Sequence, residues 1–236
     1  MVNVFSFCLY GPENPKYHVG LIENLQLIQQ YFSDWKVYVY VGSDITEERI
    51  AKILAFPQVV LRKTGKLGES NMIDRFCAID EPGVDVMFVR DADSRIHWKD
   101  RWAIQQFLST SYSLHIIRDH KEHTSPILGG LWGLRKPDVS IRQLYTQYTE
   151  DKSLGHRWAH DQNFLADVVY PKFKRDALVH FSHERIYQGE IGFTFPFEWS
   201  NDIYCGRIED ASFQERPKQK ERPLSFLPSV LVKVSR

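Results

Sequence analysis

The sequence predicts an α/β fold in which a mixed, mostly parallel central sheet is flanked by helices. Short runs of β-branched and aromatic residues, typical of buried strands, alternate with segments whose apolar residues recur at helical spacing. Strands that alternate with helices are joined by right-handed crossovers, which place helices on both faces of a sheet. The chain has 236 residues, of which 43% are hydrophobic and 25% charged. It is therefore long enough for one such domain with a full core.

The first half of the chain contains four predicted strands and three predicted helices. Strands are expected where apolar residues cluster or alternate and a turn residue follows, at residues 4–10, 36–41, 59–61 and 84–89. Helices are expected where apolar residues recur three or four apart, at residues 18–32, from Thr46 onward, and at 71–79. Residues 1–95 together form the half that we expect to bind a nucleotide.

The second half continues this alternation before it becomes irregular. Further strands are expected at residues 113–117, 127–134 and 177–181. Further helices are expected at residues 100–108, at 139–148 and from Trp158 onward. We expect irregular structure from Gly192. Residues 96–215 complete a single domain, and residues 216–236 are a basic, proline-containing tail that should add little to the core.

Composition limits the classes of function. The formal net charge is +0, so no overall field attracts nucleic acid, and we expect no nucleic-acid partner. Three scattered cysteines favour a reducing compartment over a disulfide framework. No apolar run approaches the length of a membrane span, and the N-terminus has no signal-peptide pattern. The expected location is cytoplasmic, at most peripheral to a membrane through the tail.

The strongest functional motif follows the predicted strand at residues 84–89, which runs directly into Asp91 and Asp93. The end of that strand delivers the two aspartates to the edge where open α/β sheets bind ligands. In an extended segment, side chains two residues apart point the same way, so both carboxylates face one small volume. Oxygen ligands of this kind suit Mn²⁺ or Mg²⁺, completed by substrate phosphates. The alternative is two ordinary turn acids.

A second motif is the glycine pair Gly129-Gly130, which lies between apolar residues. Glycine lets the backbone approach another group closely. The alternative is a bulged strand packed against a neighbour.

The order of the motifs resembles the GT-A fold of nucleotide-sugar glycosyltransferases. In sequence order, it comprises a nucleotide-binding half, the Asp-x-Asp of residues 91–93, a glycine-rich strand, Asp161-Gln162 opening a helix, and a strand ending in His180. The glycogenin-like and lipooligosaccharide-galactosyltransferase group shows this order. Several of the motifs also resemble little-characterised bacterial and viral proteins grouped as glycosyltransferases. The likeness covers residues 4–206, but the Lys-Pro-Trp usual in the first group is missing after Phe181.

The resemblance implies a metal-dependent transfer of a sugar from a nucleoside-diphosphate sugar donor to a saccharide, glycoprotein or glycolipid acceptor. Asp93, Asp91 and His180 would bind the metal, Mn²⁺ or Mg²⁺, with His183 as the reserve ligand. The alternative for His180 is a satisfied core histidine. The remaining donor-binding residues would be Arg75, Phe7 and Tyr10, with the Tyr10 ring stacked on the nucleobase. Alternatively, Arg75 lies on a solvated helix face and residues 7–10 form a plain core strand.

On the acceptor side, the resemblance implies that Asp161 works on the acceptor hydroxyl or lines the reacting face. Its alternative role is a helix N-cap. If it proves to be only a cap, Asp119 and Glu122 are the next candidates. The other residues predicted to bind the acceptor are His120, Gly129, Gly130, Trp132, His156 and Gln162. Trp132 is equally compatible with a place in the core.

Two other functions are compatible with parts of this pattern. A haloacid-dehalogenase-type phosphatase also has an Asp-x-Asp after a strand, but Arg95 stands where such enzymes have Thr or Val. The other alternative is a non-catalytic nucleotide-sugar-binding protein with a degenerate site. Phosphate release from a monoester would indicate the first, and binding without turnover the second.

Overall fold

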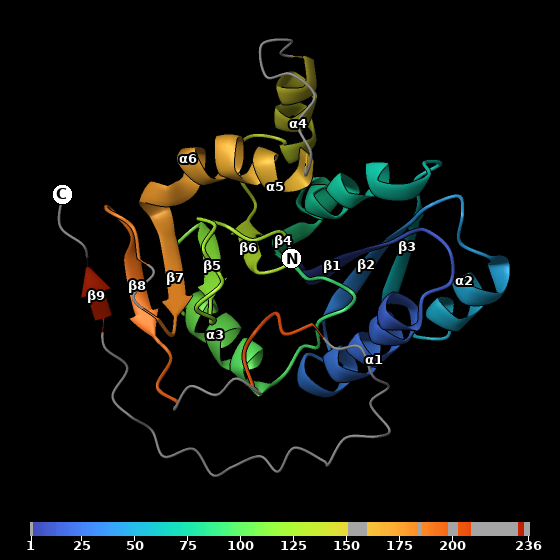
Figure 1. Ribbon diagram of the computed structural model, residues 1–236, viewed down its shortest axis with the longest axis horizontal. Helices are drawn as coiled ribbons and strands as arrows, with labels where there is room; N and C mark the ends of the chain where they lie inside the picture. The colour runs from blue at the N-terminus through green and yellow to red at the C-terminus, as the bar shows by residue number, and fades with distance from the viewer. Residues whose placement is uncertain (1, 151–159, 184–185, 198–202, 209–230, 234–236) are drawn as a thin grey trace.

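A computed structural model describes residues 2–150, 160–183, 186–197, 203–208 and 231–233 of the chain. Within these ranges, nine strands form one sheet in the order β3-β2-β1-β4-β6-β5-β7-β8-β9 (Figure 1). The strands are β1 (Val2–Leu9), β2 (Lys36–Val41), β3 (Val59–Lys63), β4 (Val84–Val89), β5 (Leu114–Arg118), β6 (Trp132–Arg135), β7 (Ala177–Phe181), β8 (Ile191–Thr194) and β9 (Leu231–Lys233).

The sheet is mixed and mostly parallel, as predicted. β3, β2, β1 and β4 run parallel, as do β5, β7 and β8. β6 is antiparallel to both β4 and β5, and β9 is antiparallel to β8. The parallel order is therefore interrupted beside β4, the strand that leads into the two aspartates.

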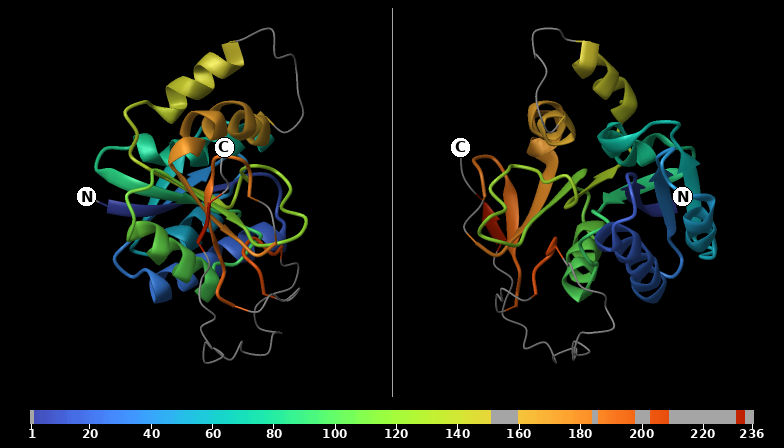
Figure 2. Two further views of the ribbon diagram at one scale, coloured as in Figure 1. Left: turned by 90° about the vertical axis from the view of Figure 1, so that its left-hand side faces the viewer. Right: turned by 45° about the vertical axis from the view of Figure 1, so that its right-hand side comes forward.

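Helical segments cover both faces of the sheet (Figure 2). On one face, α1 (Pro15–Tyr31), α2 (Glu47–Leu54) and α3 (Trp98–Leu108) pack over a core that includes Leu21, Ile50 and Phe107. The other face is covered by η1 (Gly68–Asp80), α4 (Ile141–Glu150), α5 (His160–Phe164), η3 (Leu165–Val169) and α6 (Tyr170–Phe173). The short turn η4 (Lys174–Asp176) leads into β7. No described helix is long and apolar enough to cross a lipid bilayer.

Four features differ from the predicted elements. Residues 68–80 form a run of 3-10 helix rather than an α-helix. The glycine-rich strand is shorter than expected, since β6 begins only at Trp132 and residues 127–131 are a loop. β8 lies where irregular structure was expected, and it pairs with β9, which falls inside the predicted tail. The rest of residues 216–236, and Trp158, lie outside the described residues.

Candidate active site

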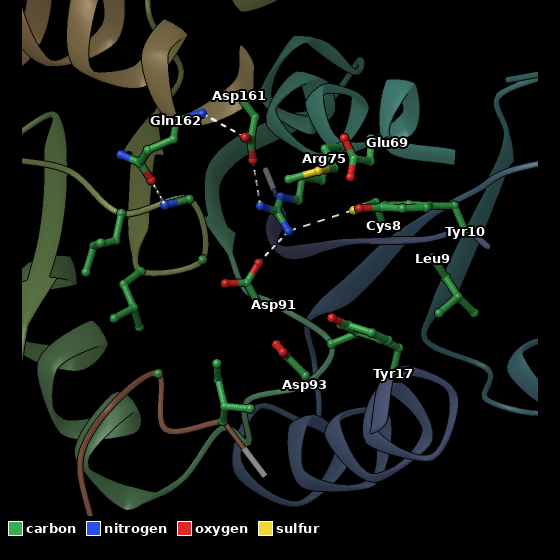
Figure 3. A pocket seen from close by; sticks show the side chains of 18 of the residues that line it. Cys8, Leu9, Tyr10, Tyr17, Glu69, Arg75, Asp91, Asp93, Asp161 and Gln162 are labelled. Atoms are coloured by element: carbon green, nitrogen blue, oxygen red, sulfur yellow. Dashed lines mark hydrogen bonds and ion pairs between the residues drawn. The ribbon is translucent and has the colours of Figure 1, made fainter. Parts of the chain in front are cut away.

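A cavity of about 600 Å³ opens at the carboxyl ends of β1 and β4 (Figure 3). Six segments contribute most of its lining: the end of β1, the first turn of α1, η1, the loop after β4, residues 128–131 and the first turn of α5. The polar groups among the lining side chains are those of Cys8, Tyr10, Tyr17, Glu69, Arg75, Asp91, Asp93, His123, Asp161 and Gln162. The two predicted carboxylates thus open on a cavity large enough for a ligand.

Arg75 is the central side chain of this cavity. Its guanidinium lies 2.5 Å from Asp91 Oδ1 through Nη1 and 3.2 Å from Asp161 Oδ2 through Nη2. It is 5% exposed and therefore does not lie on a solvated helix face. Burial alone would lower the pKa of Arg75, but the carboxylates of Asp91 and Asp161 raise it above its ordinary value. A single buried cation therefore joins an aspartate after β4 to an aspartate on α5, 70 residues later in the chain.

The backbone carbonyl of Arg75 is held in turn by β1, since the Ser6 hydroxyl donates to it at 2.6 Å. Cys8, on the same strand, lies with its Sγ 3.8 Å from Arg75 Nη1. Burial raises the pKa of the Cys8 thiol to about 11. The thiol is therefore neutral and unreactive at neutral pH, and packs beside Arg75 as a small apolar group.

The glycine pair allows the close approach that the sequence suggested. A Cβ on Gly130 would lie 2.1 Å from Asp91 Oδ2, and one on Gly129 would lie 3.0 Å from Arg75 Nη2. Gln162 holds the same loop, because its Oε1 accepts from the Gly129 amide at 3.0 Å. The group that the glycines approach is thus the Asp91–Arg75–Asp161 cluster itself.

Asp93 lies deeper than Asp91, with 11% of its side chain exposed against 42%. Its carboxylate is paired with Lys16 of α1, whose Nζ lies 3.2 Å from Asp93 Oδ2. Burial and the neighbouring Asp91 raise the pKa of Asp93, and the ammonium of Lys16 opposes this shift.

Helix α1 fixes the loop that carries both aspartates. The side chain of Asn24, which is fully buried, donates to Ser94 O at 2.7 Å and accepts from the Ile96 amide at 2.9 Å. Arg95 Nε lies 2.5 Å from Glu23 Oε2. A Cβ on Gly20 would lie 2.2 Å from the Ala92 carbonyl, so glycine is needed where the helix meets the loop.

Comparison with solved structures places this arrangement in a known fold. Neither the protein-family models nor the curated protein sequences gave a match. A glycosyltransferase involved in the glycosylation of the major capsid of PBCV-1 superposes with a TM-score of 0.52 and 14% identity, over 77% of this chain and 82% of that one. The glycosyltransferase GlyE of Streptococcus pneumoniae gives a TM-score of 0.52 and 15% identity, over 75% of this chain and 44% of that one. The chain has the GT-A fold.

The GT-A fold is also shared by an enzyme of another class. The 4-diphosphocytidyl-2C-methyl-D-erythritol synthase of Anaerococcus prevotii superposes with a TM-score of 0.52 and 8% identity, over 80% of this chain and 90% of that one. The fold therefore limits the reaction less than the residues in the cavity do.

His180 does not take the position that the resemblance implies. It is fully buried in β7, where its Nδ1 lies 2.9 Å from His115 Nε2 and its Nε2 lies 2.6 Å from Gln106 Oε1. Both ring nitrogens are therefore engaged, and the ring does not line the cavity. In this structure His180 is therefore a core histidine. His183 does not line the cavity either.

Two other predicted binding residues also lie in the core. Phe7 is fully buried in the layer between the sheet and α1–α3, and Trp132 is fully buried on the opposite face. Because alternate residues of a strand face opposite ways, Phe7 faces the core layer while its neighbour Cys8 lines the cavity. Tyr10, just past the end of β1, lines the cavity and remains available to pack against a base.

His123, rather than the predicted His120, lines the cavity. His120 is 8% exposed and stacks on Tyr204, with ring centroids 4.3 Å apart. His123 lines the cavity, and burial lowers its pKa to about 4, so it is neutral at physiological pH. Predicted residues Gly129, Gly130 and Gln162 do line the cavity, and His156 lies outside the described residues.

Several cavity residues carried no signal in the sequence. Tyr17 and Met72 line the cavity from segments that read as ordinary helix, and Gly206 and Ile208 from a stretch without regular pattern. Lys16, which pairs with the lining residue Asp93, also lies in a segment that reads as ordinary helix. Only Lys16 has a local feature in the sequence, because it directly follows the Asn-Pro pair at which α1 begins. A long-range pair such as Lys16–Asp93 is invisible to local patterns.

Proposed function

We propose that this chain transfers a glycosyl group from a nucleoside-diphosphate sugar to a hydroxyl of a saccharide, glycoprotein or glycolipid. The observation that carries the proposal is the Asp91–Arg75–Asp161 cluster, which lies in the cavity at the carboxyl ends of β1 and β4 of a GT-A fold. That edge is where nucleotides bind in sheets of this type.

The cavity offers separate places for the parts of the donor. Figure 3 shows Tyr10 and Glu69 on one side, Gln162 on the other, and Asp91 with Arg75 between them. A nucleobase packed against Tyr10 would direct its phosphates toward Asp91 and Asp93, and its sugar toward Asp161 and Gln162. Base, diphosphate and transferred sugar follow one another in the same order along a nucleoside-diphosphate sugar.

The carboxylates fit a divalent ion. Asp91 Oδ1 is used by Arg75 and Asp93 Oδ2 by Lys16, but each carboxylate has a second oxygen, and substrate phosphates usually complete a Mg²⁺ or Mn²⁺ shell. Asp91 and Asp93 would hold the ion, without His180. The ion would stabilise the charge that develops on the leaving diphosphate.

Arg75 and the glycine loop orient the reacting end. Arg75 keeps Asp91 and Asp161 in fixed positions through its permanent charge and its two ion pairs. Asp161 can accept a hydrogen bond from a sugar hydroxyl or take the proton of an acceptor hydroxyl. Gln162 is occupied by the backbone of the glycine loop, so its first role is to position that loop.

Two other reactions remain as alternatives with distinct products. The fold is shared with a 4-diphosphocytidyl-2C-methyl-D-erythritol synthase, so one alternative is nucleotidyl transfer, which would release pyrophosphate from a nucleoside triphosphate. A phosphatase of the haloacid-dehalogenase type would need Asp91 as a nucleophile. Its pairing with Arg75 at 2.5 Å disfavours that reaction.

Calorimetry with UDP, GDP, CDP and ADP, each with and without Mn²⁺, tests the proposal. We expect one of them to bind in Mn²⁺, and the matching sugar nucleotide to be hydrolysed or to donate its sugar to an acceptor. Asp93→Ala should remove Mn²⁺-dependent binding and activity while the chain remains folded. Undiminished Mn²⁺-dependent binding in this variant would show that the metal site is elsewhere.

A further inference from the structure

Each carboxylate of the Asp-x-Asp is already paired with a cation of the chain itself. Asp91 is paired with Arg75 at 2.5 Å, and Asp93 is paired with Lys16 at 3.2 Å. Each of the two carboxylates thus has a positive partner without any added ion, although Arg75 shares its charge with Asp161. A divalent cation that binds the same two carboxylates is repelled by both side chains and therefore competes with them for the negative charge.

The two cations differ in how firmly they are held. The Arg75 side chain is 7% exposed, and two aspartates share its guanidinium. The Lys16 side chain is 25% exposed and lies in the first turn of α1, where its ammonium is 5.4 Å from the centre of the Tyr17 ring. A lysine ammonium is a compact charge on a flexible four-carbon stem, whereas a guanidinium shared by two acids is fixed. Lys16 is the cation that can move.

A divalent ion at Asp93 would repel the ammonium, which would then lose its carboxylate. The diphosphate that arrives at the same carboxylates with the ion would offer the ammonium a new anionic partner. The Lys16 ammonium already lies at the edge of the cavity, because it contacts Asp93 and Tyr17, which both line it.

We infer that Lys16 is an exchangeable cation, which neutralises Asp93 when the site is empty and moves to the donor's diphosphate when a divalent ion takes Asp93. This inference rests on the proposed function, since it assumes a diphosphate ligand. It assigns Lys16 two effects of opposite sign. Lys16 weakens the binding of the metal alone, and it strengthens the binding of the nucleotide together with the metal.

Lys16→Met separates these two effects, because it removes the charge and keeps most of the apolar stem. Binding of Mn²⁺ alone, followed by the electron paramagnetic resonance of the free ion, should become roughly 3-fold tighter or more, the scale of a partly exposed ion pair. Binding of the nucleoside diphosphate in saturating Mn²⁺, followed by calorimetry, should become roughly 10-fold weaker, the scale of a hydrogen bond to a charged group. Lys16→Arg, which keeps the positive charge, should retain much of the parent's affinity for the nucleoside diphosphate.

The matched control is Lys63→Met, which removes another lysine from a carboxylate pair, with Glu47 at 2.7 Å. It should change neither affinity. If Lys16→Met leaves both affinities at the parent values, or if both move in the same direction, the exchange does not occur and Lys16 is an ordinary ion-pair partner. If the parent binds none of the nucleoside diphosphates, the proposed function fails first, and this inference fails with it.

Discussion

Gly130 sets how closely the glycine loop approaches Asp91, and this makes it the most sensitive single position of the site. Its missing side chain leaves room for Asp91 Oδ2, which would lie 2.1 Å from a Cβ. Gly130→Ala must therefore displace the carboxylate or the loop. At Gly129 the nearest atom is Arg75 Nη2, at 3.0 Å, so a Cβ there would overlap its neighbour far less.

We expect Gly130→Ala to weaken nucleoside-diphosphate binding by roughly 10-fold or more. The reason is that it moves the Asp91 carboxylate, which we propose binds the divalent ion through its charge. Gly129→Ala should weaken it much less. Calorimetry on both variants, with melting curves to confirm that each is folded, measures the difference. Equal affinities in the two variants would mean that the position of Asp91 does not limit binding.

Asp161→Asn tests the other end of the cluster. The sequence suggested that Asp161 faces the acceptor side, apart from the diphosphate, but its Oδ2 lies 3.2 Å from the same guanidinium that holds Asp91. Donor binding and transfer are therefore linked through Arg75. We expect transfer to fall by roughly 10²-fold, the scale for losing a group that moves a proton, and donor affinity to fall several-fold as well.

Steady-state rates with saturating and with limiting donor distinguish these two losses. Asp167→Asn, in the same helical region, is a suitable control, because that residue does not line the cavity. An Asp161→Asn enzyme that keeps the parent rate would leave Asp161 with a structural role only. Asp119 is then a poor substitute, since it is fully buried and lies 2.6 Å from Lys99.

The residues that sequence reasoning identified are those with a local pattern. Asp91 and Asp93 could be found because a strand ends in front of them, and the glycine pair because it interrupts an apolar run. His180 also ends a strand, yet its environment is set by His115 and Gln106, which come from other elements. Local pattern predicts that a side chain reaches the end of a strand, but not which groups surround it there.

At the scale of elements, α1 is the support of the loop after β4. Asn24 occupies both a carbonyl and an amide of that loop, at Ser94 and Ile96. Removing its side chain leaves two buried backbone groups without their partner, at a cost of about 1–3 kcal/mol. We expect Asn24→Ala to be destabilised by this amount and to bind the nucleoside diphosphate more weakly.

Urea unfolding measures the first effect of Asn24→Ala, and hydrogen exchange at the Ile96 amide measures whether the loop has loosened. Gln26→Ala is the matched control, since Gln26 lies on the exposed face of the same helix. If exchange at Ile96 stays slow while stability falls, α1 contributes to the core but does not hold the loop.

Elements were predictable where the apolar period was clear. β1, β2 and β4 were close to the predicted ranges, because buried parallel strands are continuous apolar runs. The 3-10 form of η1 was not predictable, since its apolar spacing also fits an α-helix. β8 and β9 were missed because each is only three or four residues long, and β9 pairs with β8 across 36 residues of chain.

At the scale of the whole molecule, the sheet contains a pair of buried histidines. His115 of β5 and His180 of β7 are fully buried beside one another, with Phe107 stacked on His115 at 4.9 Å. His180 Nε2 donates to Gln106 Oε1, so its Nδ1 accepts from His115 Nε2. This arrangement requires the His180 ring to be neutral, and burial disfavours a charge on the His115 ring, whose Nδ1 has no hydrogen-bond partner among the described residues. Burial lowers the pKa of His180 to about 3 and that of His115 well below its usual range.

The stability of the fold should therefore fall as the pH falls below about 6.5, the pKa of a histidine in the unfolded chain. Between that value and the low folded pKa values, the unfolded chain binds more protons than the folded one, so acid favours unfolding. Each of the two histidines should cost up to about 1.4 kcal/mol per pH unit in this range. His123, whose pKa is lowered to about 4, acts in the same direction.

Urea unfolding at pH 7.5, 6.5 and 5.5 measures this slope. The double variant His115→Leu/His180→Leu should be less stable at pH 7.5, because it loses packing and leaves Gln106 without its partner. Its free energy of unfolding should nevertheless depend less on pH than that of the parent, since two titrating groups are gone. His160→Gln, at an exposed histidine, should keep the parent slope. A double variant with the parent slope would show that these histidines are not the groups that take up protons on unfolding.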